Sequence, residues 1–152
     1  MTSKQLADDL RAVYFGGNWT GVSLQKHLQD IPKQQATTKL SDCNSIATLA
    51  YHLHYYVRQV SPVLRGEALR GSDADSFITP DFTVGDTWSN FLEAMWSEAR
   101  QFAQQIEQLD DNLLGTDMDD PKYGSYYRNL QGIIAHAHYH LGQIVLLKKV
   151  QG

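Results

Sequence analysis

Four long stretches of the sequence repeat apolar residues at the spacing of an α-helix, and none alternates as a half-buried β-strand would. They cover residues 3–14, 45–65, 84–109 and 125–149, and a shorter amphipathic piece lies at 20–31. The apolar positions of the last stretch illustrate the pattern: Leu130, Ile133, Ile134, Ala137, Leu141, Ile144 and Val145. Four long helices in 152 residues predict an all-α four-helix bundle, folded as a single domain over residues 1–152.

Polar, glycine-containing segments separate these stretches. Residues 16–18 (Gly-Gly-Asn) break the helix that precedes them, and Pro32 either ends the short piece at 20–31 or starts a short turn of helix through Thr38. Residues 66–80 and 110–124 contain few apolar side chains, so we expect two long surface loops there. We expect the tryptophans to lie in the core: Trp19, Trp88 and Trp96.

Composition excludes several classes of protein. The net charge is −4 and no long run of Lys or Arg occurs, which argues against a nucleic-acid partner. No stretch of about 18 apolar residues is present, so we expect no membrane-spanning helix. Because the N-terminal residues carry no apolar signal core and Cys43 is the single cysteine, we expect a cytoplasmic protein without an internal disulfide.

The histidines are the most informative polar residues. Five of the six fall in two helical windows, as His52 and His54 and as His136, His138 and His140. Residues four apart share a helix face, so His136 and His140 project together while His138 points away. Two imidazoles at this spacing can bind one metal ion, and a third ligand from another helix would strengthen the site.

The helical wheel does not decide which histidine of the 45–65 helix supplies that third ligand. His52 and His54 lie on opposite flanks of its apolar stripe, and only the nearby Tyr55 and Tyr56 give His52 a slight preference. A histidine pair of this kind also arises by chance on surface or core helices. No Glu-x-x-His or His-Glu-x-x-His motif is present, which argues against a di-iron carboxylate bundle and a zinc protease.

The sequence resembles the DinB-like superfamily, also described as DinB/YfiT-like metalloenzymes, and in particular its small uncharacterised bacterial members. The resemblance covers nearly the whole chain. It is carried by four segments: Gly16-Gly-Asn-Trp-Thr20, Gln35-Ala-Thr-Thr38, Ile46-Ala-Thr-Leu-Ala-Tyr-His-Leu-His-Tyr-Tyr-Val57 and His136-Ala-His-Tyr-His-Leu-Gly-Gln-Ile144.

The resemblance implies an up-and-down four-helix bundle with the family's own connectivity, often paired as a homodimer. It also implies a metal ion held by His52, His136 and His140, which selects His52 over His54. His54 and His138 match no family role and are interpreted as flanking surface or second-shell residues. Imidazole suits several divalent ions, and we expect Zn or Ni before Fe or Cu.

Three histidine ligands leave a coordination position open for chemistry. Family members of known activity imply a metal-dependent transferase or isomerase that uses a low-molecular-weight thiol as a small-molecule substrate. The alternative is a non-enzymatic metal-binding stress or interaction module. An enzyme acting on an anionic thiol should place a cation near the metal, and Arg58 and Arg128 are the candidates. Gln143, one turn beyond His140, could orient a ligand or substrate, or could equally be an ordinary surface residue of the helix.

Overall fold

The computed structural model describes residues 1–152 and contains helices and their connections without any β-strand. The four long helices are α1 (Ser3–Phe15), α4 (Ile46–Val63), α5 (Thr87–Glu107) and α6 (Tyr126–Gln151). The short elements are α2 (Leu24–Leu28), α3 (Lys33–Thr37) and the 3₁₀ turns η1 (Asp75–Phe77), η2 (Asp111–Leu113) and η3 (Pro121–Tyr123). Helices cover more than half of the chain, which confirms the predicted all-α class.

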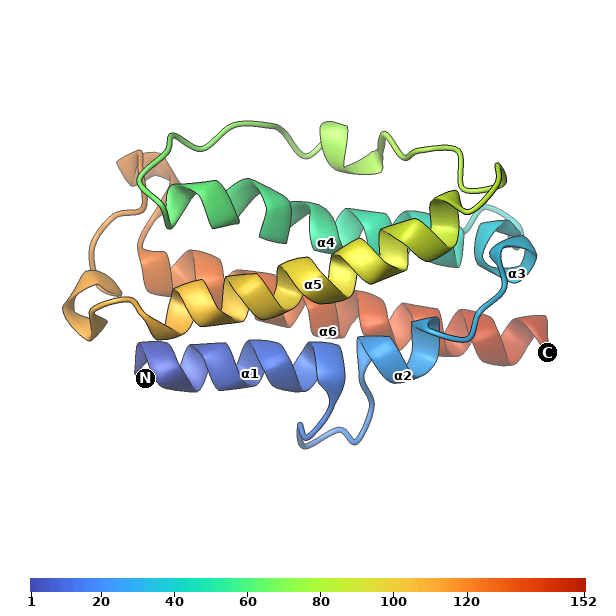
Figure 1. Cartoon of the computed structure of the whole chain (residues 1–152), viewed down its shortest axis with the longest axis horizontal. Helices are drawn as coiled ribbons and strands as arrows, with labels where there is room; N and C mark the ends of the chain where they lie inside the picture. Colours follow the sequence, from blue (N-terminus) through green and yellow to red (C-terminus); the bar gives the residue numbers. More distant parts are fainter.

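The four long helices lie side by side along the length of the molecule (Figure 1). The connection over residues 64–86 runs back along α4, so α4 and α5 start at the same end and point in the same direction (Figure 1). Contacts between them agree, because Tyr51 meets Phe91 and His54 meets Glu98 further along both helices. At up to about 3.3 Å per residue, this connection easily spans the roughly 27 Å of an 18-residue helix. This order differs from a simple up-and-down succession, which would make α4 and α5 antiparallel.

Side-chain caps fix where the long helices begin. Thr2 and Gln5 form a reciprocal capping box at the start of α1. Ser45 and Ser125 accept hydrogen bonds from backbone N–H groups in the first turns of α4 and α6. The apolar faces that follow these caps merge into one core of 35 buried residues.

The segment after α1 differs from the prediction. The helix expected over residues 20–31 is present only as α2, which begins after its N-cap Ser23. The loop before α2 is held by hydrogen bonds of Asn18. Its side-chain amide donates to the backbone oxygens of Ala12 and Val22. Trp19 projects from this loop with 99% of its surface exposed, so its expected place in the core was wrong, whereas Trp88 and Trp96 are buried as predicted.

Candidate metal centre

The histidines predicted from the sequence meet where α4 faces α6. The Nε2 atom of His136 lies 3.0 Å from Nε2 of His52 and 2.9 Å from Nε2 of His140. One ligand atom from each of the three lies within 4.8 Å of the others. His52 and His140 are buried and His136 is half-buried, so the three rings form a compact group that could hold a metal ion.

Hydrogen bonds fix the tautomers of two of these rings. The Ser76 hydroxyl donates to the backbone oxygen of Asp73, so its oxygen accepts from Nδ1–H of His52, 2.8 Å away. His140 donates through Nδ1 to the Gln143 side-chain oxygen at 2.7 Å. Each neutral imidazole carries one N–H, so both rings present a bare lone pair at Nε2. Gln143 therefore orients a ring of the group, which is one of the two roles that the sequence left open for it.

The convergence of these nitrogens leaves room for a cation that would separate their lone pairs. His136 carries one proton and can donate through Nε2 to only one neighbour, so at least one of the two short contacts joins two lone pairs. Its Nδ1 atom is buried and has no hydrogen-bond partner. Metal–nitrogen bonds of about 2.05 Å in tetrahedral geometry separate the nitrogens by about 3.3 Å, which is close to the two short contacts that His136 makes.

Burial keeps the three histidines neutral. It lowers the pKa of His52, with a further contribution from His140, and it also lowers the pKa of His140. The pKa of His136 falls to about 4, because burial and both neighbouring rings oppose a positive charge. Neutral imidazoles are the form that binds metals, so the three rings could hold an ion at pH 7.

We expect the metal-free protein to lose stability as the pH falls from 6.5 towards 5. The unfolded chain takes up protons at its histidines near pH 6.5, whereas the folded chain resists protonation at the site, so acid favours unfolding. Urea midpoints measured at both pH values check this. Between these two pH values, the His136→Ala variant should lose less stability than the parent. An equal loss would mean that the site histidines do not cause the acid sensitivity.

The connection between α4 and α5 covers the outer side of the centre. The Phe77 ring stacks on His52 with 4.1 Å between centroids, beside the buried Ser76. The Asp73 carboxylate accepts a hydrogen bond of 2.6 Å from the Tyr56 hydroxyl. Sequence reasoning treated residues 66–80 as a surface loop and missed these contributions, because no periodic pattern marks a side chain that turns inward from a loop.

Gly71 anchors this connection to α4. Its φ of +94° favours glycine, and an added Cβ would collide with the Tyr55 hydroxyl and the Gln59 side chain. Tyr55 cannot simply move aside, since its oxygen accepts a hydrogen bond from the Ser72 backbone N–H at 3.1 Å.

Gly71→Ala should therefore destabilise the fold by roughly 1–3 kcal/mol more than Gly66→Ala. Gly66 has a similar φ of +92° but open space around it. Comparing the two variants therefore separates the collision of the added Cβ with Tyr55 from the cost of backbone strain. Chemical denaturation of both variants gives the difference. Equal losses would show that the Tyr55 contact does not hold the connection in place.

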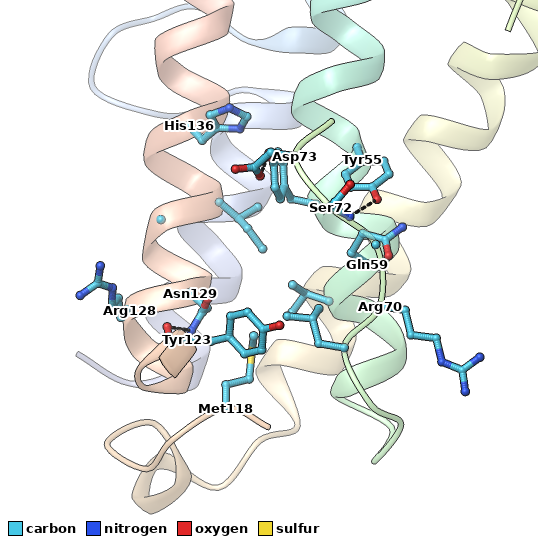
Figure 2. A pocket seen from close by; sticks show the side chains of 16 residues that line it. Tyr55, Gln59, Arg70, Ser72, Asp73, Met118, Tyr123, Arg128, Asn129 and His136 are labelled. Carbon is cyan, nitrogen blue, oxygen red and sulfur yellow. Dashed lines mark hydrogen bonds between the residues drawn. The ribbon is translucent and has the colours of Figure 1, made fainter. Parts of the chain in front are cut away.

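A pocket of about 570 Å³ opens beside the histidines, between α4, α6 and the 64–86 connection. His136 and Asp73 lie at one end and Met118 and Tyr123 at the other (Figure 2). Arg128 belongs to its wall, although its guanidinium points outward in this view. Its volume is typical of sites that take small organic molecules.

The other candidate cation, Arg58, lies in a separate cluster. It donates to Glu98 through Nε at 2.7 Å, and His54 Nε2 lies 2.7 Å from the same carboxylate. His54 is completely buried, so its interpretation as a flanking surface or second-shell residue was wrong. His138 is half-buried and outside the three-histidine group, as the helical spacing predicted.

Comparison with known proteins finds no matching protein family, curated protein or solved structure. None of the helices combines the length and apolar character needed to cross a membrane. The interpretation of this centre therefore depends on its own geometry.

Proposed function

We propose that this chain is a DinB-like four-helix-bundle protein that binds one divalent metal ion through His52, His136 and His140. The convergence of three Nε2 atoms, two of them with their lone pairs fixed by hydrogen bonds at Nδ1, carries the proposal. All four metals considered accept imidazole nitrogen. Zn and Ni are the first candidates, followed by Fe and Cu.

We further propose that the centre activates a low-molecular-weight thiol for a transfer or isomerisation reaction. A metal ion held by three histidines keeps a coordination position open and favours the ionised form of a thiol or water placed there. The pocket at His136 supports an enzyme over a purely metal-storing module, since it gives a small molecule access to one histidine of the group. Its wall combines apolar side chains with Asp73, Asn129 and Arg128, which suits a molecule of mixed polarity.

Metal analysis of protein purified without a histidine tag tests the first step. We expect about one Zn or Ni ion per chain, and absence of binding by the metal-free protein in a Zn²⁺ titration would overturn the proposal. Reaction of the loaded protein with several thiols and electrophiles tests the second step. Metal binding without thiol binding would favour the non-enzymatic module.

We also propose a homodimer formed through α6. Tyr139, Leu146 and Val150 share one helix face and are 64%, 62% and 66% exposed, which leaves an apolar stripe uncovered. Sedimentation should give about twice the chain mass of 17.2 kDa, and Leu146→Glu should reduce it to that of one chain. Val84→Glu, an exposed apolar position before α5, is the control and should stay dimeric. A parent mass of one chain at micromolar concentration would contradict the dimer.

A further inference from the structure

Asp73 is the acidic side chain of the pocket wall beside the histidine centre. It shares the pocket with His136, and its backbone oxygen holds the Ser76 hydroxyl that orients His52. Figure 2 shows it at the same end of the pocket as His136. It does not belong to the group of three metal-binding candidates, so its carboxylate is a wall residue of the pocket outside that group.

One oxygen of the Asp73 carboxylate accepts a hydrogen bond from the protein, and the other accepts none. The Tyr56 hydroxyl donates to Oδ1 at 2.6 Å, and the Tyr56 ring itself packs edge-on against His136, with 5.0 Å between centroids. No protein group donates a hydrogen bond to Oδ2. A carboxylate held in this way has one oxygen fixed by the protein and one available to a ligand in the pocket.

We propose that Asp73 accepts the proton of the thiol that enters this site, and that Tyr56 is the positioning residue that aims the carboxylate. The inference rests on the proposed thiol-binding function. The S–H bond breaks, the proton moves to Oδ2 of Asp73, and the electron pair stays on the sulfur, which binds the ion. Because Asp73 is exposed, it returns the proton to water at the pocket mouth.

The test is the rate at which Co²⁺-loaded protein captures 2-mercaptoethanol. Visible absorption in a stopped-flow instrument follows this capture. At neutral pH the thiol is protonated, and Asp73→Asn should slow capture on the order of 100-fold. Above the ionisation range of the thiol no proton needs removal, so Asp73→Asn should match or exceed the parent. Tyr56→Phe should show a smaller loss with the same dependence on pH.

Asp75→Asn is the matched control, because Asp75 lies two residues away in the same connection and bonds Ser72 instead of a group at the centre. It should behave as the parent at every pH, and Co²⁺ affinity should stay the same in all these variants. A loss in Asp73→Asn that is equal at all pH values would mean a structural role and overturn the inference. If the Co²⁺-loaded parent binds no thiol, the proposed thiol function is wrong. If the parent does not bind Co²⁺ at all, the proposed metal site is wrong.

Discussion

His136→Ala is expected to lower the affinity for Zn²⁺ by more than 100-fold. Loss of a hydrogen-bond partner behind a metal ligand already costs about 10- to 100-fold, and this variant removes a ligand itself. His136 is the central member of the group, since both short contacts between ring nitrogens involve it. Calorimetric titration of the metal-free protein gives the affinities directly.

The other histidines supply the comparison. His52→Ala and His140→Ala should each show a loss similar to that of His136→Ala, whereas His138→Ala should bind Zn²⁺ within a few-fold of the parent. Zn²⁺ at 100 times its dissociation constant should stabilise the parent by about 2.7 kcal/mol, and this gain should disappear in His136→Ala. A His138→Ala affinity as low as that of His140→Ala would mean that the helix-face assignment is wrong.

Part of this centre could be predicted because it depends on local geometry. His136 and His140 are one helical turn apart, so their common direction follows from the helix alone. The choice between His52 and His54 depends on which helix packs against each flank of α4, and the helical wheel contains no such information. In the structure His52 faces α6, and His54 faces Tyr14 of α1 and Glu98 of α5.

The contributions of the connections could not be predicted in the same way. Ser76 and Asp73 come from a segment without periodicity, and their positions depend on how residues 64–86 fold back over α4. Trp19 illustrates the opposite error. Its size suggested burial, but the hydrogen bonds of Asn18 hold the loop in a shape that leaves the ring in solvent.

The buried cluster around His54 should be the most sensitive polar part of the fold. The hydroxyl of Tyr14 lies 3.0 Å from Nδ1 of His54, and Nε2 of the same ring lies 2.7 Å from Glu98. Burial raises the pKa of Tyr14 and lowers the pKa of His54, so Tyr14 donates to a neutral ring that donates to Glu98. Burial opposes ionisation of Glu98, but hydrogen bonds from His54 and Arg58 outweigh it and lower its pKa to about 2.

We therefore expect His54→Ala to reduce the free energy of unfolding by about 3 kcal/mol or more. The change leaves the Tyr14 hydroxyl buried without a partner, takes a donor from Glu98 and opens a cavity beside α1. His138→Ala, which removes the same side chain from a half-buried position without hydrogen bonds, should cost less than about 1 kcal/mol. Urea denaturation of the metal-free proteins at pH 7 measures both.

The double variant Tyr14→Phe/His54→Ala separates the hydrogen-bond chain from simple loss of packing. Phenylalanine has no hydroxyl that could be left buried without a hydrogen-bond partner. The double variant should therefore lose less stability than the sum of the losses in the two single variants. Additive losses would mean that the Tyr14–His54 bond contributes nothing of its own. Zn²⁺ affinity should change little in His54→Ala under conditions where the variant is folded, because His54 turns away from the three-histidine centre.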